Sequence, residues 1–237
     1  MIAGFGIRRR PFCPVVILSV FLALSVPNAL PAEELSVAEM RSRLKEGVIA
    51  FDRGQPEWAL ELLLPLAENE KHGGAAYLIA IVHVTFASHI NMDLHFNWLR
   101  RSAQYGFAPA YMKLFDHAHD NFQFEVAYGW ALRAAKAGYD IGFLRLSEMI
   151  CDTYSVYRVV PHDPTIADAW LTLGLGGIKM DDPVWKEFVC GDKEPDSARR
   201  IAIQEKVEEL RGFFRPKPLN DPLAEWREWA SEASGNR

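Results

Sequence analysis

The sequence predicts an all-α fold, a solenoid of antiparallel helix pairs, and two observations support this prediction. A pattern of bulky and small residues recurs at a spacing of 32 positions, and self-similarity at a fixed period is typical of repeat proteins. Glycine also follows each apolar helical run, at Gly106 and Gly138, where a helix can end in a left-handed residue. The recurring pairs are Trp98 and Trp130, Ala103 and Ala135, Gly106 and Gly138, Ala110 and Gly142, and Leu114 and Leu146.

These residue types match what stacked helical hairpins require. Each hairpin buries its apolar faces only against its neighbours, so a bulky residue must fill the gap between units. Trp98 and Trp130 fit that role, and small residues such as Ala135 and Gly142 fit positions where helices approach closely. The repeating unit is therefore a helix, a glycine turn and a second helix.

The spacing resembles that of the Sel-one-like repeats (SLR), relatives of the tetratricopeptide repeats. The resemblance covers roughly residues 40 to 177 and implies a right-handed α–α superhelix. The family's Gly and Tyr after the motif Leu are absent, and Phe115, Ala118, Ser147 and Ile150 occupy those positions. The matching residues are Ala127, Trp130, Ala134, Ala135, Gly138 and Leu146 in one copy, and Trp98, Ala103, Gly106, Ala110 and Leu114 in the copy before it.

The organisation of the chain is predicted in three parts. Residues 1–32 have the layout of a secretory signal, because three arginines at 8–10 precede an apolar run over 15–26 and small residues follow it. Cleavage is expected after Ala32, with Ala29 as the competing site. Residues 33–180 would hold the Sel-one-like repeats, and residues 181–237 a degenerate terminal repeat and C-terminal capping helices. No transmembrane segment is expected after signal removal, and the predicted location is periplasmic or secreted.

Removal of the signal makes the chain more acidic. The whole chain has a net charge of −5, and loss of three arginines leaves 23 basic and 31 acidic residues, a charge of −8 over 237 − 32 = 205 residues. This balance argues against nucleic acid or an anionic membrane surface as the main partner.

Two cysteines remain in that part of the chain, Cys151 and Cys190. An oxidising compartment favours a disulfide between them, worth about 4 kcal/mol in the chain-entropy model. The alternative is two buried thiols on separate helices, because sequence separation does not establish the geometry of a bridge.

The positions of most helices follow from capping and breaking residues. Ser36 with Glu39 matches a capping box, Asn91 is a candidate N-cap, and Asp163 before Pro164 is a good helix start. Gly73 and Gly74 are expected to break the chain before a long apolar helix. The expected helices lie at 36–53, from 56 through 66, from 75 to 86, at 91–105, 108–118, 123–137 and 140–153, from 164, and at 182–189, 196–213 and 223–233.

Candidate chemical sites are weak. His117 and His119 lie two residues apart, which is the wrong spacing for one helix face, and His83, His89 and His95 lie upstream of them. Ordinary helix-surface histidines are the favoured interpretation of all five. The glycines of 174–180 lack the spacing of a phosphate-binding loop. We expect neither catalysis nor a bound cofactor or metal ion.

The tryptophans have two possible roles. Trp58, Trp98, Trp130 and Trp170 could form a sugar-binding face, but recurrence with the repeat favours core packing for most of them. Leu223, Trp226 and Trp229 lie on one side of the final helix, which would either cap the last repeat or, if exposed, dock a partner.

The predicted function is that of a periplasmic scaffold or regulator that binds another protein. The resemblance to the Sel-one-like repeats implies roles such as scaffolding an envelope or polysaccharide-secretion complex or restraining a membrane sensor. The first helix of each hairpin lines the concave surface of such a solenoid, where extended binding sites form. The alternative is a protein of the same repeat family that binds or hydrolyses cell-wall fragments or β-lactams. By analogy with tetratricopeptide geometry, the groove residues would be Met112, Asp116, His119, Leu144, Glu148 and Cys151.

Overall fold

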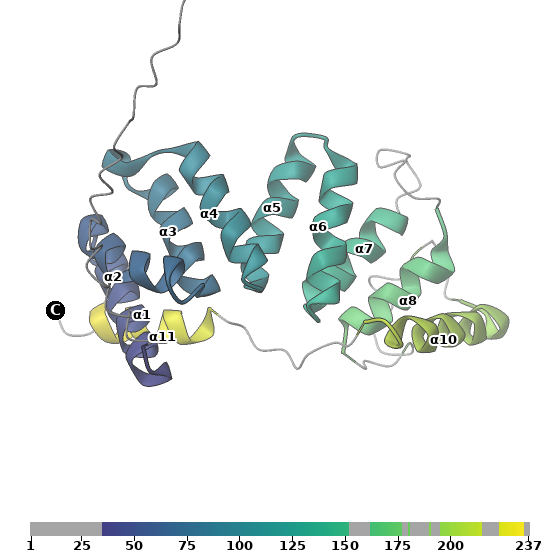
Figure 1. Cartoon of the computed structure of the whole chain (residues 1–237). Helices are drawn as coiled ribbons and strands as arrows, with labels where there is room; N and C mark the ends of the chain where they lie inside the picture. Colours follow the sequence, from purple (N-terminus) through teal and green to yellow (C-terminus); the bar gives the residue numbers. More distant parts are fainter. Residues whose placement is uncertain are drawn as a thin grey trace, which may run out of the picture. The chain divides into compact units, whose positions relative to one another are not determined.

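The computed structural model describes residues 35–151, 162–176, 180, 190, 195–214 and 223–234, and all regular elements in these ranges are helical (Figure 1). The expected signal, the loop after Cys151, the helix at 182–189 and the spacer at 216–222 lie outside the described residues. The helices are α1 (Val37–Asp52), α2 (Pro56–Glu68), α3 (Gly73–Thr85), η1 (Ala87–His89, a 3-10 turn), α4 (Met92–Gln104), α5 (Ala108–Asp120), α6 (Phe124–Lys136), α7 (Asp140–Cys151), α8 (Pro164–Gly174), α10 (Ser197–Arg211) and α11 (Ala224–Ser234).

Each helix from α1 to α8 packs against the next one along the chain, and α10 packs on α8. The closest pairings are α1 with α2, α3 with α4, α5 with α6 and α7 with α8, so these are the hairpins of the array. Gly106 and Gly138 therefore lie between successive hairpins, which corrects the expected unit of a helix, a glycine turn and a second helix. We call α1, α3, α5 and α7 the first helices of the hairpins. This neighbour-to-neighbour packing confirms the predicted all-α solenoid of helix pairs.

Helix starts follow the predicted capping residues. Glu39 N–H donates to the Ser36 hydroxyl at 3.3 Å, and Ser36 N–H donates back to the Glu39 carboxylate at 2.8 Å, so the capping box is complete. Asn91 caps α4 through its side-chain oxygen, and Asp163 caps α8 in the same way. These local signals were therefore sufficient to place three of the helix N-termini.

The expected break at Gly73 and Gly74 is wrong, because both glycines belong to the first turn of α3. The residue before the helix is His72, the N-cap of α3, whose imidazole accepts a hydrogen bond from Ala75 N–H at 3.2 Å. Glycine is needed at position 73 for space instead, since a Cβ there would lie 2.8 Å from the Cβ of Phe107.

The glycines between α4 and α5 and between α6 and α7 have the predicted conformation. Gly106 has φ +81° and Gly138 has φ +83°, the left-handed region in which any side chain is strained. The chain therefore turns with equivalent geometry at these two junctions between hairpins.

Trp98 and Trp130 share one contact, an arginine over the ring, although Trp98 is buried and Trp130 is partly buried. The Arg101 guanidinium lies 4.6 Å from the Trp98 ring centre, and Arg133 lies 4.4 Å from that of Trp130. Each arginine follows its tryptophan by three positions in the sequence, so the repeat includes a cation–π contact on its bulky residue. Trp58 differs, because it is 41% exposed and is not a core residue.

Gly142 and Gly129 give a matched test of helix packing. A Cβ at Gly142 would lie 2.5 Å from the Ala135 nitrogen, whereas a Cβ at Gly129 would meet nothing within 4 Å. We expect Gly142→Ala to lower the free energy of unfolding by about 1–3 kcal/mol through overpacking. Gly129→Ala should raise it by about 0.5–1 kcal/mol through helix propensity. Urea denaturation of both variants measures the difference, and equal effects would contradict close contact between α6 and α7.

The last helix does not pack where the sequence suggested. Trp226 and Trp229 are buried, but they join a cluster with α1 and α3 and not with the last repeat. Among the described helices, α10 packs on α8, and its Ile203 and Val207 are buried in the cluster containing Trp170. The expectation that α11 caps the last repeat is therefore wrong.

Within the described residues, no helix combines the length and the apolar character needed to cross a bilayer.

Candidate functional site

The predicted groove residues lie on two first helices, α5 and α7. Asp116 and Glu148 are separated by 32 positions, so they occupy the same place in successive repeats, and both are exposed. Lys113 and Arg145 are related in the same way, one turn earlier on each helix. Acidic and basic side chains thus recur in register along α5 and α7.

Met112 and Leu144, the apolar members of the predicted set, are partly buried against the C-terminal core cluster. Leu144 packs on α8, where a Cβ at Gly174 would lie 2.9 Å from its side chain. These two residues therefore support the helix packing beneath the surface more than they contribute to the surface itself.

His119 and Cys151 are also engaged with neighbouring residues. The His119 ring stacks on Phe115 with the ring centres 5.7 Å apart, and it meets the edge of Phe124 at the start of α6. Cys151 is bonded to Cys190. Asp116 and Glu148 are thus the predicted residues whose carboxylates extend to the exposed surface.

Arg145 connects the two helices. Its guanidinium lies 5.5 Å from the ring centre of Phe115 on α5 and donates to the Glu148 carboxylate at 2.7 Å on its own helix. The Glu148 carboxylate is consequently held in position by an ion pair, although at 57% exposure that pair adds little stability.

Asp116 also acts on α3. Burial raises the pKa of the Tyr77 hydroxyl, and the negative charge of Asp116 raises it further.

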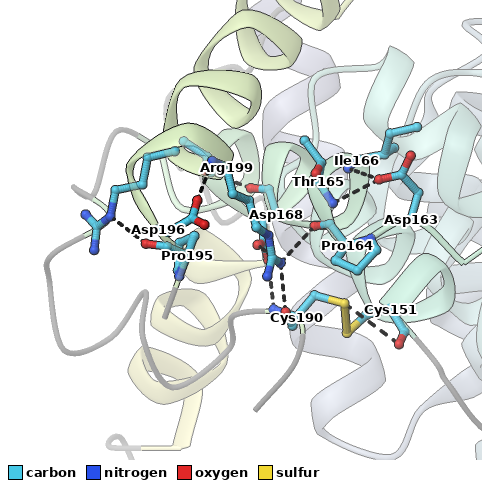
Figure 2. Close-up of polar contacts among 12 residues, drawn as sticks. Cys151, Asp163, Pro164, Thr165, Ile166, Asp168, Cys190, Pro195, Asp196 and Arg199 are labelled. Atoms are coloured by element: carbon cyan, nitrogen blue, oxygen red, sulfur yellow. Dashed lines mark hydrogen bonds and ion pairs between the residues drawn. A yellow bond between two sulfur atoms is a disulfide. The ribbon is translucent and has the colours of Figure 1, made fainter. Parts of the chain in front are cut away.

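Cys151 and Cys190 form a disulfide with their Cα atoms 5.4 Å apart, which confirms the bridge and removes the alternative of two thiols (Figure 2). The bridge ties the end of α7 to a position shortly before α10. It therefore closes the chain around α8.

Beside the disulfide lies a buried carboxylate that sequence reasoning missed, that of Asp168 on α8. The side chain is fully buried and accepts from Cys190 N–H at 2.7 Å and from Arg199 of α10 at 2.5 Å (Figure 2). Arg199 also donates to the Cys190 carbonyl at 2.8 Å. Burial raises the pKa of Asp168, while the Cys190 N–H and the Arg199 charge oppose that rise. The one available signal was an acidic residue inside the apolar run ADAWL.

Two of the histidines expected on helix surfaces are instead buried, which corrects that expectation. His95 Nδ1 donates to the Ala80 carbonyl at 2.7 Å and His83 Nδ1 donates to the His89 carbonyl at 3.0 Å. Burial lowers the pKa of His95. In the part of the chain described by the structure, no three His, Cys, Asp or Glu side chains are grouped so that they could hold a metal ion.

Comparison with known proteins identifies the fold. No protein-family model and no curated protein matches the chain. Among solved structures, a Sel1 repeat protein from Oxalobacter formigenes superposes with a TM-score of 0.52 at 16% identity, covering 84% of this chain and 88% of that one. At this identity the likeness concerns the fold, and the fold is the one predicted from the residue spacing. The chain is a helical-repeat protein with the fold of the Sel1 repeats.

Proposed function

We propose that this protein is a periplasmic scaffold or regulator that binds another protein through the concave surface lined by the first helices, without catalysis of its own. The observation that carries the proposal is the recurrence of exposed acidic side chains, Asp116 and Glu148, at one position of successive repeats. Like side chains at one position of two successive repeats suit an extended partner, which can contact each repeat in turn.

The charge of the surface suggests the chemistry of that partner. Asp116 and Glu148 are both exposed, and the Glu148 carboxylate is held by Arg145 of its own helix. A partner segment with basic residues would gain electrostatic complementarity, which mainly favours specificity and fast association.

Two features support the periplasmic part of the proposal. The first 32 residues have the charge and hydropathy pattern of a secretory signal. The Cys151–Cys190 disulfide is of the kind that persists in oxidising compartments such as the bacterial periplasm.

The test is affinity capture from the periplasm, followed by mass spectrometry. The surface variant carries Asp116→Lys and Glu148→Lys. The matched control carries Asp93→Lys and Glu125→Lys, two exposed acids that are also 32 positions apart but lie on α4 and α6. We expect the wild type and the control to recover the same partner, and the surface variant to lose it. Recovery of the same proteins by all three chains would refute the proposed surface.

A further inference from the structure

The C-terminal helix α11 covers the first helices at the start of the array. It packs against α1, and its two indoles are buried in the cluster that includes α1 and α3 (Figure 1). Trp226 is 9% exposed and Trp229 is 4% exposed, although they belong to a helix of 11 residues at the end of the chain. A segment far along the sequence thus covers a surface of the first repeats.

Trp226 occupies an aromatic site that the repeats provide. Its ring stacks on Phe107, the N-cap residue of α5, with an interplanar angle of 16° and ring centres 5.6 Å apart. It also meets Tyr77 of α3 at 6.2 Å, and Tyr77 and Phe107 contact each other at 5.3 Å. Gly74 leaves the space for the indole, because a Cβ there would lie 3.0 Å from Trp226. These groups together fit a large aromatic side chain.

A charged contact fixes the direction of the helix. Glu225, just before Trp226, pairs with Arg41 of α1, whose Nε donates to the carboxylate at 3.0 Å. Both side chains are substantially exposed, so the pair orients the helix more than it stabilises it. We call the surface formed by Arg41, Gly74, Tyr77 and Phe107 the α11 site.

The composition of α3 shows that this surface needs a cover. The helix GGAAYLIAIVHVT is apolar over most of its length, and with α11 in place all residues from Gly74 to Val82 except Ile81 are buried. A first helix at an open surface of a solenoid would instead be amphipathic. The apolar side of α3 is therefore complete only when a helix with aromatic residues lies on it.

We propose that the α11 site is a docking site for an amphipathic helix that presents two aromatic side chains three positions apart and an acidic residue before the first. In this structure α11 fills the site from within the same chain and competes with such a partner. The inference rests on the proposed function, because it names the class of segment that binds the first helices. The seated helix itself supplies the argument, since it shows which side chains the site accepts.

Competition within one chain sets the design of the test. A tethered helix acts at an effective concentration of roughly millimolar, so a free helix binds poorly while α11 is in place. The probe is a fluorescently labelled peptide of residues 223–234, titrated in fluorescence anisotropy into the full chain and into the full chain carrying Trp226→Ala and Trp229→Ala. We expect the peptide to bind the double variant at least about tenfold more tightly than it binds the wild type. A peptide with both tryptophans changed to alanine should bind neither chain, because buried tryptophans dominate helix docking.

The charged contact provides a control for position. Arg41→Glu in the double variant should weaken binding of the native peptide by about two- to fivefold, as expected for an exposed ion pair. The same change should strengthen binding of a peptide that carries Glu225→Arg. The proposal would be overturned if the native peptide bound the wild type and a folded double variant with equal affinity. It would also be overturned if the peptide bound neither chain.

If the double variant does not fold, hydrogen exchange of the wild type decides the matter. Amides of α11 should exchange through a local opening at least about tenfold faster than those of α3. Exchange of both helices with one common rate would show that α11 is an inseparable part of the fold and would overturn the proposal. The peptide requires no natural partner, so its failure leaves the capture experiment, and with it the proposed function, to be judged separately.

Discussion

Asp168→Ala is expected to lower the free energy of unfolding by about 3 kcal/mol. Asp168 is fully buried, and its removal leaves the Arg199 guanidinium without its carboxylate and the Cys190 N–H without an acceptor. Breaking a buried pair costs about 3–5 kcal/mol in general. We expect the lower end because Arg199 is 25% exposed and water can reach it in part.

Urea denaturation monitored by circular dichroism measures this change. The matched control is Glu208→Ala, which removes a carboxylate 2.7 Å from Arg211 where both side chains are at least half exposed. That variant should lose at most about 1 kcal/mol. Replacement of both partners, Asp168→Leu with Arg199→Met, should lose less than Asp168→Ala because no unpaired charge remains, with a residual loss of about 1–3 kcal/mol from the Cys190 N–H that still lacks its acceptor. A loss no larger for Asp168→Ala than for Glu208→Ala would mean that the buried pair is absent in solution.

Removal of the disulfide should cost a similar amount, about 4 kcal/mol by the chain-entropy estimate. Cys151 and Cys190 are 39 positions apart, and the closed loop contains α8. The variant with Cys151→Ala and Cys190→Ala should therefore unfold at a much lower urea concentration. Dithiothreitol should lower the midpoint of the wild type and leave that of the variant unchanged. A wild-type midpoint insensitive to the reductant, with both thiols shown to be free, would contradict the prediction.

The two losses should not add. The Asp168 carboxylate holds the backbone of Cys190, so the ion pair and the disulfide fix the same short stretch of chain. Groups that share a partner show coupling of about 0.5–3 kcal/mol in double-mutant cycles. The combined variant should therefore lose less than the sum of the two separate effects.

The sequence predicted features that depend on neighbours in the chain. The Ser36–Glu39 capping box, the left-handed Gly106 and Gly138 and the close approach at Gly142 each follow from local residue types and one repeated spacing. The repeat extends these local signals into a fold, because every unit packs on the next one in the same way.

What the sequence did not predict depends on contacts between distant segments. In the sequence, Asp168 is an isolated acidic residue within an apolar helix. Its partners Arg199 and Cys190 are 31 and 22 positions away, and the local pattern does not indicate that they pair with it. The sequence predicted that the aromatic residues of α11 form one apolar stripe. The surface on which this stripe packs includes Tyr77 and Phe107, which lie more than a hundred positions earlier in the chain. Capping residues and hydrophobic periodicity carry no information about contacts between segments that are far apart in the sequence.

The contact of α11 with α1 changes how the array can come apart. In an ordinary row of repeats the outermost units fray first, since each has a neighbour on one side only. Here α11 packs on α1 of the first hairpin, so local unfolding of either helix removes a packing contact of the other. A protein that replaced α11 on the first hairpin would keep that hairpin stabilised against fraying. It would also displace α11, which would then be available for other contacts.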